Sequence, residues 1–433
     1  MLRDFLNELD SDGLLVKIQK PVSVKYEAAG LLKALDGRPV LLESIKESEM
    51  RVIGNIFATR ELVAKYLKTE SSNLLFRMAD AIDKPKKPKE AKEPGKAPFN
   101  EKHSPDLSPL PILTHCEGDG GPYLSSSVVA ARDKEYGGNL SFHRMMVVDK
   151  KHLVLRILPR HLNEFIKRNG GELDVAICVG GSVPFLLGGA TSVDIGFDEM
   201  TIANSLEPLT VSPSPLYKIP VPTETEIVIE GRITKKLAPE GKFVDLTETH
   251  DIIREQPLME IKRVSYRNDA YYQALLPGGL EHKTLMGMPR EPTIYREVSK
   301  VCKCTNVYLT TGGCSWLHGV VQIDKLAEDD GKKAIEAAFK GHSSMKFVAV
   351  VDKDINMLDP NDIEWAIATR VQAGKALVVK PHEKGSSLDP SADPNTRETA
   401  KWGLDATKPL ETKGKDFNRV PFPKVRLEEY LAK

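Results

Sequence analysis

The pattern of apolar and polar positions changes twice along the chain and predicts three regions. Residues 2–13 repeat with a helical period and end at a glycine, two short apolar runs follow, and a second helix is expected from Thr59 to Lys68. These elements predict a small α/β region over residues 1–100. Its last part, residues 83–102, is rich in lysine, glutamate and proline and cannot bury a core, so we expect a solvated linker there.

Residues 101–295 contain many short runs of β-branched and other apolar residues, separated by turns. Such a series predicts a barrel or a curled sheet. The turns DKEYGGN, DKKH and PEGK are expected to join neighbouring strands as hairpins. Two helices interrupt the strands, at 162–172 and 198–206, and Asp198 is the expected N-cap of the second.

Residues 296–433 return to alternating strands and helices, which predicts a second α/β domain with a mostly parallel sheet. An apolar strand at 345–355 leads into a capped helix at 359–372, and a closing helix is expected at 427–433. The predicted fold class is therefore mixed, α/β with α+β character.

Composition narrows the class of protein. Lysine plus arginine and aspartate plus glutamate both number 61, so the formal net charge is zero, which argues against a nucleic-acid partner. No stretch approaches the roughly eighteen apolar residues of a membrane span, and the first residues lack the order of a signal peptide, so we expect a cytoplasmic protein. The five cysteines are an odd number, which fits a reducing compartment. Cys302, Cys304 and Cys314 lack metal-site spacing and are interpreted as buried thiols.

One stretch, GGNLSFHRMMVVDKKHLVLRILPRH, concentrates side chains that carry chemistry. Asn139, His143, Arg144 and His161 lie within one predicted hairpin. Because alternate residues of a strand share a face, Asn139, Ser141 and His143 are expected to point one way and Arg144 the other. A turn asparagine, a histidine with its hydrogen bonds satisfied and a surface arginine are equally ordinary interpretations of these residues.

Two groups of carboxylates follow. Asp198 and Glu199 come after a glycine at a helix start, where acids often only complement the helix dipole. Glu240 and Asp245 flank the turn PEGK. Two carboxylates near an arginine could share a proton, which would move one pKa toward neutrality. The alternative is a hairpin turn exposed to solvent.

Several separated blocks then occur in a recognisable order: NLSFHR, LPRH, GFDEMTIA, PTETEIVIEG, APEGKFVD, VSYRNDAYY and VDKDINMLDPNDIEWAIATR. From about residue 110 to 400 the chain resembles the UbiD family of reversible decarboxylases. The resemblance implies a central flavin-binding split β-barrel between an N-terminal α/β region and a C-terminal α/β domain. It places the active site between the barrel and the C-terminal domain. It also implies that subunits pair through the C-terminal region, as a homodimer or a larger homo-oligomer.

The resemblance carries a metal and a cofactor with it. The family's metal-binding Asn, His and Glu match Asn139, His161 and Glu199, which implies Mn²⁺ or Mg²⁺ clamping a flavin phosphate. The implied cofactor is prenylated FMN, made by a separate flavin prenyltransferase, and K⁺ is a further cation that the family pattern allows. The cofactor contacts assigned in this way are Asn139, Ser141, Phe142, His143, Arg144, Arg160, His161 and Glu199.

The family's catalytic network matches Arg144, Glu240 and Asp245. Prenylated FMN would supply the electron sink, and Asp245 would deliver a proton to the carbon that loses CO₂, which requires a raised pKa. Arg144 would hold both acids. His143 or Glu281 is the alternative acid.

His143 and Arg160 differ from some relatives, and two cations beside the flavin would suit an acid with a second negative group. Together with the short segment at 275–298, they favour trans-anhydromevalonate 5-phosphate, an isoprenoid precursor, as the unsaturated acid. The alternative substrate is an aromatic acid, such as a hydroxybenzoate or a polyprenyl-hydroxybenzoate. Two other classes are an ordinary FMN or NAD(P)H oxidoreductase, although no GxGxxG follows a strand, and a non-catalytic assembly subunit.

Overall fold

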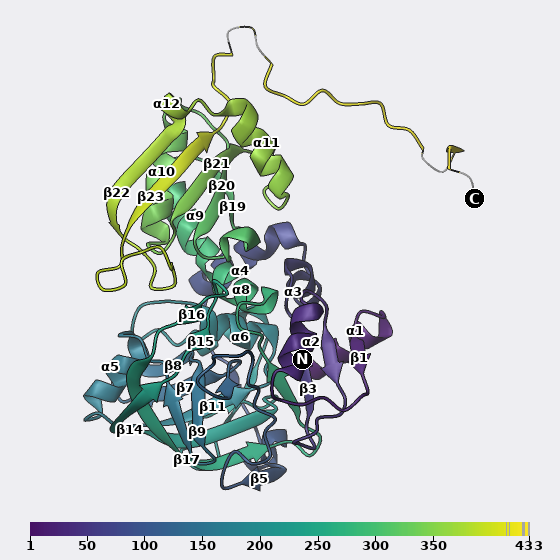
Figure 1. Cartoon of the computed structure of the whole chain (residues 1–433), viewed down its shortest axis with the longest axis vertical. Helices are drawn as coiled ribbons and strands as arrows, with labels where there is room; N and C mark the ends of the chain where they lie inside the picture. The colour runs from purple at the N-terminus through teal and green to yellow at the C-terminus, as the bar shows by residue number, and fades with distance from the viewer. Residues whose placement is uncertain (413, 415, 427–428, 432–433) are drawn as a thin grey trace.

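The structure is a computed structural model that describes residues 1–412, 414, 416–426 and 429–431 (Figure 1). The chain forms a small N-terminal α/β region, a central β-rich domain and a C-terminal α/β domain, and the last described residues extend away from the C-terminal domain. The mixed α/β class expected from the sequence is confirmed. The closing helix expected at 427–433 falls largely outside the described residues.

The N-terminal region builds a four-stranded sheet in the order β1-β2-β3-β18. The last strand, β18 (Tyr271–Ala274), comes from the far end of the central domain, and its parallel pairing with β3 joins the two regions. Thr59 caps the helix expected after it, since its side chain accepts a bond from the Leu62 amide at 3.3 Å. The elements of this region are α1 (Leu2–Ser11), β1 (Val16–Ile18), α2 (Glu27–Ala34), β2 (Val40–Leu42), β3 (Arg51–Gly54), α3 (Arg60–Tyr66) and α4 (Leu74–Asp83).

The lysine- and proline-rich segment at 83–102 follows the surface of the central domain. Most of its side chains are exposed, as expected for a linker, but Phe99 is fully buried in a core. Two short strands fix its path: β4 (Lys89–Glu90) pairs with β12 (Thr210–Pro213), and β5 (Lys102–Ser104) pairs with β17. A single aromatic anchor and two short pairings therefore hold a segment whose composition indicates solvation.

The central domain is built on a nine-stranded sheet. Eight strands follow the order β6-β9-β10-β17-β14-β11-β7-β8, and β5 pairs with β17 beside this path. Alternating apolar residues of these strands fill two large cores, one on each face of the sheet. The strands are β6 (Tyr123–Leu124), β7 (Val128–Asp133), β8 (Gly137–Phe142), β9 (Met145–Asp149), β10 (His152–Leu155), β11 (Leu173–Val179), β14 (Ile227–Glu240) and β17 (Arg254–Tyr266).

A two-residue connection forces this sheet to curl. Strand β8 lies at one end of the order and β9 is second from the other end, yet only His143 and Arg144 separate them in the chain. The His143 amide donates to the Ser127 carbonyl beside β7 (3.3 Å), and the Arg144 carbonyl accepts from the Arg156 amide beside β10 (3.1 Å). Within the described residues no register pairs β8 with β9. The sheet is therefore a barrel that is split at His143 and Arg144, a position we call the seam.

The expected hairpins are partly corrected. The first two turns join β7 to β8 and β9 to β10, as predicted. PEGK closes no hairpin, because β14 pairs with β17 and the chain between them forms a small hairpin of its own, β15 (Phe243–Val244) with β16 (His250–Asp251). Asn139, Arg144 and His161 likewise do not share one hairpin, since Asn139 lies in β8, Arg144 lies in the seam and His161 begins a helix.

Helices cover the split side of the barrel. Helices α6 and α7 contact β8, and α5 contacts both β7 and β8. Asp198 is the N-cap of α7, as predicted, with its carboxylate accepting from the Met200 amide at 3.0 Å. The remaining elements of the domain are α5 (His161–Arg168), α6 (Val183–Ala190), α7 (Glu199–Leu206) and β13 (Pro220–Pro222).

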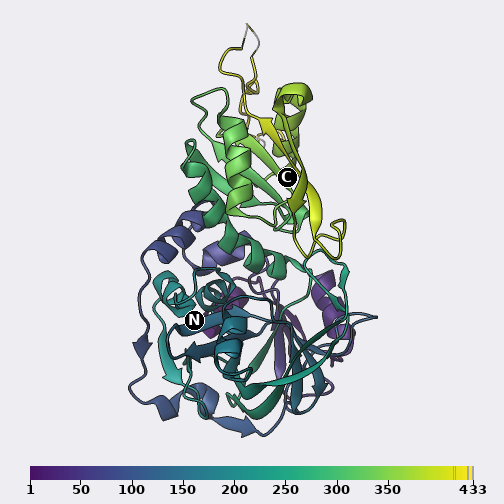
Figure 2. The same cartoon turned by 90° about the vertical axis from the view of Figure 1, so that its left-hand side faces the viewer.

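The C-terminal domain stacks on the barrel, with α4, α8 and α9 near the junction (Figures 1 and 2). Its sheet has the order β19-β20-β21-β23-β22 and is mixed, with two parallel and two antiparallel pairings, so the expectation of a mostly parallel sheet is wrong. Its elements are α8 (Leu280–Gly287), α9 (Glu291–Ser299), β19 (Cys304–Leu309), β20 (His318–Ile323), α10 (Asp330–Gly341), β21 (Phe347–Asp352), α11 (Pro360–Arg370), α12 (Ala373–Ala376), β22 (Leu377–Lys384) and β23 (Glu398–Ala406).

All five cysteines are free thiols, and Cys302, Cys304 and Cys314 are buried or half-buried around β19. Among the described residues, no helix combines the length and the apolar character needed to cross a bilayer.

A close glycine contact holds the PEGK turn itself against the 114–121 loop. The Gly120 amide donates to the Lys242 carbonyl at 2.8 Å, and a Cβ added at Gly120 would lie 2.5 Å from the Gly241 Cα and 2.9 Å from Met146 Sδ. Gly120→Ala should therefore destabilise the protein by about 1–3 kcal/mol, because a tightly packed backbone must move. Gly30→Ala in α2 is the control, since an added methyl meets nothing within 4 Å and should be neutral or slightly stabilising. Urea unfolding of both variants measures the difference, and equal stability would contradict the contact.

Candidate active site

A cavity of about 740 Å³ lies between the barrel and the C-terminal domain. Its size falls within the range of roughly 300–1,000 Å³ typical of small-molecule and cofactor sites. The barrel contributes the residues around the seam, and the C-terminal domain contributes Trp316 and Ser386, among others. Every residue that the sequence assigned to the cofactor lines this cavity: Asn139, Ser141, Phe142, His143, Arg144, Arg160, His161 and Glu199.

Arg144 projects from the seam and binds three carboxylates at once. Its Nε donates to Glu240 Oε1 at 2.6 Å, and its Nη2 donates to Glu240 Oε2 at 3.1 Å and to Asp251 Oδ2 at 2.8 Å. Its Nη1 donates to Asp245 Oδ2. Phe243 lies 4.9 Å from the guanidinium, measured to the ring centroid. The structure thus brings together the three residues assigned to catalysis and adds Asp251, which the sequence interpretation missed.

The three acids differ in their exposure to the cavity, and Asp251 has a lowered pKa. Glu240 is fully buried behind Arg144 and does not line the cavity, whereas Asp245 and Asp251 do. Burial alone would raise the pKa of Asp251, but hydrogen bonds from Arg254 (2.6 Å) and Arg144 outweigh it and lower that pKa to about 2. Asp251 is therefore a fixed negative charge at neutral pH, and Asp245 is the acid that faces the cavity without a second arginine.

The turn after β15 positions Asp245. The Asp245 amide donates to the Thr249 carbonyl at 3.0 Å, and the Glu248 amide returns a bond to the Asp245 carbonyl at 2.8 Å. Glu248 in turn accepts from Lys283 at 2.6 Å and from Lys33 at 3.0 Å, so lysines of α8 and α2 hold the turn. Contacts from two other regions of the chain therefore set the place of this carboxylate.

The other group of predicted site residues consists of Asn139, His161 and Glu199, whose side chains converge. They come from β8, from the first turn of α5 and from the first turn of α7. Glu199 Oε1 lies 3.5 Å from His161 Nδ1 and 3.1 Å from Asn139 Nδ2, and Glu199 Oε2 accepts from the Leu140 amide at 2.8 Å. Three side chains from three elements thus meet within hydrogen-bonding or ion-pair distance.

This trio fits a divalent cation. Glu199 is only 2 % exposed, and burial raises the pKa of its carboxyl despite the neighbouring His161 and amide donors. A buried carboxylate without a lysine or arginine partner is costly, and a metal ion would supply the missing positive charge. Two oxygen donors and one imidazole suit Mn²⁺ or Mg²⁺, with the Asn139 amide turned so that its oxygen faces the ion.

His143 is not the cation that its position suggested. Its Nδ1 lies 2.9 Å from the Arg156 carbonyl, and its Nε2 lies 2.9 Å from the Ser141 hydroxyl. The pKa of His143 is lowered to about 4, chiefly by burial. The bond to the Arg156 carbonyl opposes this shift, and the charge of Arg160 adds to it. His143 is therefore a neutral ring that lines the cavity with both nitrogens engaged. The expectation that it offers a positive charge to the substrate is wrong.

Two arginines, Arg290 and Arg160, place positive charge at the cavity. Arg290, which follows α8, donates to the Ser192 hydroxyl at 2.6 Å, and Arg160 donates to the same oxygen at 3.2 Å. Burial lowers the pKa of Arg290 to about 10, and Arg160 contributes to the lowering. Neither guanidinium has a carboxylate within 4.0 Å in the described part of the chain. Two like charges on one hydroxyl form a site that an anion would stabilise.

His282 and Glu281 are neighbours in α8, but only His282 faces the cavity. His282, which no sequence argument selected, lines the cavity, and burial lowers its pKa although Asp245 opposes the shift. Glu281, named as an alternative acid, is turned away from the cavity and accepts from the backbone amides of Asn55 (3.1 Å) and Phe57 (2.9 Å). Glu281 therefore joins α8 to the N-terminal region and has no path to a ligand in the cavity.

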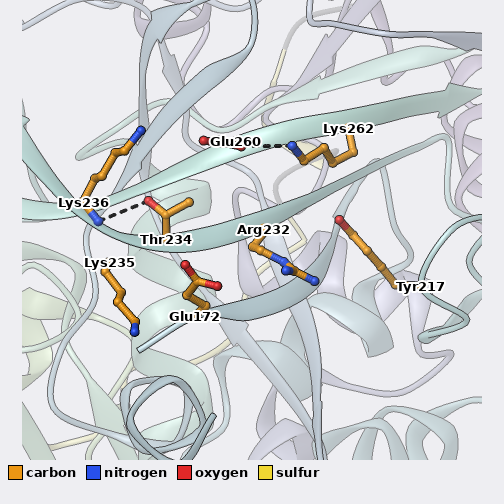
Figure 3. Close-up of a pocket in the computed structure, with 8 residues that line it drawn as sticks. All are labelled: Glu172, Tyr217, Arg232, Thr234, Lys235, Lys236, Glu260 and Lys262. Atoms are coloured by element: carbon orange, nitrogen blue, oxygen red, sulfur yellow. Dashed lines mark hydrogen bonds and ion pairs between the residues drawn. The ribbon is translucent and has the colours of Figure 1, made fainter. Parts of the chain in front are cut away.

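A second hollow lies on the outer surface of β14 and β17 (Figure 3). Some of its charged side chains pair with neighbours, such as Lys262 with Glu260 at 2.9 Å and Arg232 with Asp174 at 2.7 Å. It contains none of the residues assigned to chemistry, so the cavity at the seam is the candidate active site.

Comparison with protein families gives matches along most of the chain. The N-terminal domain of 3-octaprenyl-4-hydroxybenzoate carboxy-lyase (UbiD) matches residues 6–82, its Rift-related domain matches 88–280, and its C-terminal domain matches 283–406. The domain limits at residues 100 and 295 inferred from the sequence stay predictions.

Individual relatives match over their whole length. The chain is 41% identical over 427 residues to the anhydromevalonate phosphate decarboxylase of Methanothermobacter thermautotrophicus, covering 97% of this chain and 99% of that protein. It is also 41% identical to the enzyme of the same name from Methanocaldococcus jannaschii, covering 98% and 100%. The structure of the UbiD-class enzyme HmfF from Pelotomaculum thermopropionicum in complex with FMN superposes with a TM-score of 0.95 at 35% identity, covering 99% and 100%.

The trio around Glu199 predicts a loss of metal when its charge is removed. Glu199→Gln keeps the shape of the side chain but removes the one carboxylate of the trio. Mn²⁺ affinity should therefore fall at least roughly tenfold, the lower end of the effect of changing groups around a bound metal. Isothermal titration with Mn²⁺ measures this. Glu164→Gln, in the first turn of α5, is the control for a charge change nearby. Equal Mn²⁺ affinity in Glu199→Gln and wild type would rule out this site.

Proposed function

The chain belongs to the UbiD family of carboxy-lyases and is an enzyme of the decarboxylase class, and on this premise we propose that it uses prenylated FMN to remove CO₂ from trans-anhydromevalonate 5-phosphate. The observation that carries the proposal is that one cavity is lined by Arg144 with Asp245 and Asp251, by the Glu199 trio and by an arginine pair that has no carboxylate partner among the described residues. These three groups correspond to a proton source, a cofactor anchor and an anion site.

Prenylated FMN, when bound, supplies the electron sink for loss of CO₂. Asn139, His161 and Glu199 would hold the divalent ion that anchors the phosphate of the cofactor. Phe142 and Leu275 line the same cavity and help to keep water from the reacting carbon. Mn²⁺ is our choice for the ion, and the expectation of a K⁺ ion stays a prediction.

The protein's own task is to deliver a proton to the carbon left after CO₂ departs. Asp245 is the acid we assign to it, because it faces the cavity at the end of the Arg144 cluster. Asp251 is excluded from this role, since an acid with a pKa of about 2 has almost no proton to give near neutral pH. Glu240 and Asp251 together offset the charge of Arg144, so that Asp245 is not its sole counter-charge.

The substrate choice rests on the arginine pair. Arg290 and Arg160 lie on one hydroxyl, and a phosphate would accept hydrogen bonds from both. The relatives at 41% identity are named for a phosphorylated unsaturated acid. His143 is neutral, so the positive charge at this side comes from Arg290 and Arg160. The rival substrate is an aromatic acid, for which a structural relative exists in the 3,4-dihydroxybenzoic acid decarboxylase (AroY) of Klebsiella pneumoniae, at a TM-score of 0.92 and 25% identity. An aromatic acid without a second anion would leave the arginine pair uncompensated.

Three further expectations stay predictions. A separate flavin prenyltransferase would supply the cofactor, and the enzyme would work in the cytoplasm. Subunits would associate as a homodimer or a larger homo-oligomer, which the exposed apolar side chains of the last described residues support. Those side chains are Val420, Phe422, Val425, Tyr430 and Leu431.

Replacing the assigned proton donor tests the reaction. Asp245→Asn is nearly isosteric, so the folded protein should keep its flavin, while turnover should fall roughly 10²–10⁴-fold, the usual contribution of a general acid. Glu255→Gln, an exposed acid at the start of β17, is the control that should turn over normally. CO₂ release and deuterium exchange at the reacting carbon are measured side by side. Near-normal values of both in Asp245→Asn would assign the proton to another group, with His282 next in line.

Arg290 tests the substrate. Arg290→Met should raise KM for the phosphorylated acid roughly 10- to 100-fold, because hydrogen bonds to a charged group contribute about 1.5–3 kcal/mol. Flavin occupancy should stay unchanged. Arg296→Met, which removes an arginine of α9 that pairs with Asp83, is the control. Loss of flavin in Arg290→Met would mean that the arginine binds the phosphate of the cofactor, and an unchanged KM would return the aromatic acid to first place.

A further inference from the structure

A cluster of metal-ligating side chains lies outside the cavity, between the loop at 114–121 and the β15–β16 hairpin. Cys116 Sγ lies 3.3 Å from Asp119 Oδ1 and 3.7 Å from His250 Nε2. Asp119 Oδ1 and His250 Nε2 are 3.8 Å apart. Ligands held at about 2.0–2.3 Å from a tetrahedral zinc ion would be about 3.3–3.5 Å from one another. The observed triangle therefore needs only small side-chain rotations to close on an ion.

The surroundings of Asp119 also favour a bound metal ion. Its side chain is 1 % exposed, and no lysine or arginine lies within 4.0 Å of it among the described residues. Its Oδ2 accepts from the amides of His115 (3.2 Å) and Cys116 (3.1 Å), which fixes the carboxylate and directs Oδ1 toward the thiol and the imidazole. Hydrogen bonds that orient a ligating carboxylate in this way are typical of metal sites.

A second, independent observation comes from His115. This histidine is buried, and its Nδ1 has no hydrogen-bond partner among the residues that the structure describes, while lying 3.9 Å from Asp119 Oδ2. An unpartnered buried ring nitrogen beside a buried carboxylate is uncommon in folded proteins and is typical of places where a polar or charged ligand binds.

From these contacts we propose that Cys116, Asp119 and His250 bind a zinc ion that joins the 114–121 loop to the β15–β16 hairpin. A thiolate, an imidazole and a carboxylate select zinc over Mn²⁺ or Mg²⁺. His250 is about a third exposed, at 37 %, so a water molecule completes the tetrahedron. On binding, the Cys116 thiol gives its proton to solvent and the sulfur bonds to zinc.

The site would position catalytic groups without touching them. His250 precedes Asp251, whose carboxylate holds Arg144 at 2.8 Å, and the glycine contact between Gly120 and Gly241 lies in the same layer. A zinc ion there would tie the hairpin that carries Asp251 to the 114–121 loop, since Cys116 and His250 are 134 positions apart in the chain. This inference does not rest on the proposed substrate.

The test uses the tag-free holoenzyme. Elemental analysis should find one zinc per chain in addition to the metal at Glu199, and zinc X-ray absorption should show one sulfur neighbour at about 2.3 Å with nitrogen and oxygen at about 2.0 Å. Cys116→Ser and His250→Gln should lose this zinc while keeping Mn²⁺ and flavin, and their melting temperature should no longer respond to added zinc.

Two variants match these changes elsewhere. Cys314→Ser removes another half-buried thiol, and His152→Gln removes another partly exposed histidine, and both should keep the zinc. A wild-type spectrum without a sulfur neighbour, or zinc that persists in Cys116→Ser with its sulfur shell intact, would overturn the proposal even if the variants were unstable.

Discussion

The two-residue connection at the seam is the constraint on which the rest of this structure depends. Because β8 and β9 lie near opposite ends of one sheet, a connection through His143 and Arg144 alone requires the sheet to close upon itself. The backbone there pairs with both ends of the sheet, through Ser127 and Arg156. The same closure leaves a gap in the ladder, and the cavity opens at that gap. Fold and site therefore have a common cause.

Charge is divided within the cavity in a way that suits two different tasks. Around Arg144, three carboxylates face one arginine with Arg254 beside it, so this side can lose or accept a proton without exposing a bare cation. Around Ser192, two arginines share a hydroxyl, so this side attracts anions. A ligand whose reacting carbon lies at the first side and whose phosphate lies at the second would match both, whereas an acid without a second anion would leave the two arginines uncompensated.

The sequence interpretation failed where burial or long-range pairing decides the outcome. His143 was taken as a cation, but a buried ring whose two nitrogens are both engaged stays neutral. PEGK has the composition of a hairpin turn, yet β14 includes its first two residues and pairs with β17 as far as Glu240, whose carboxylate binds Arg144. The mostly parallel sheet was inferred from the alternation of strands and helices. The links from β19 to β20 and from β22 to β23 contain no α-helix that could cross over the sheet, so both pairs are antiparallel.

The sequence by itself determined the local elements and the inventory of reactive groups. The caps at Thr59, Asp198 and Asp359 are settled within three residues of chain, so they could be predicted, and the ordered blocks pointed to the family. Only the tertiary structure decided which groups meet. Arg144 reaches Asp251 across 107 positions and Arg290 reaches Ser192 across 98. These pairs depend on how the sheet curls and how the domains stack, and no local pattern of residues records either one, because both follow from the packing of the whole chain.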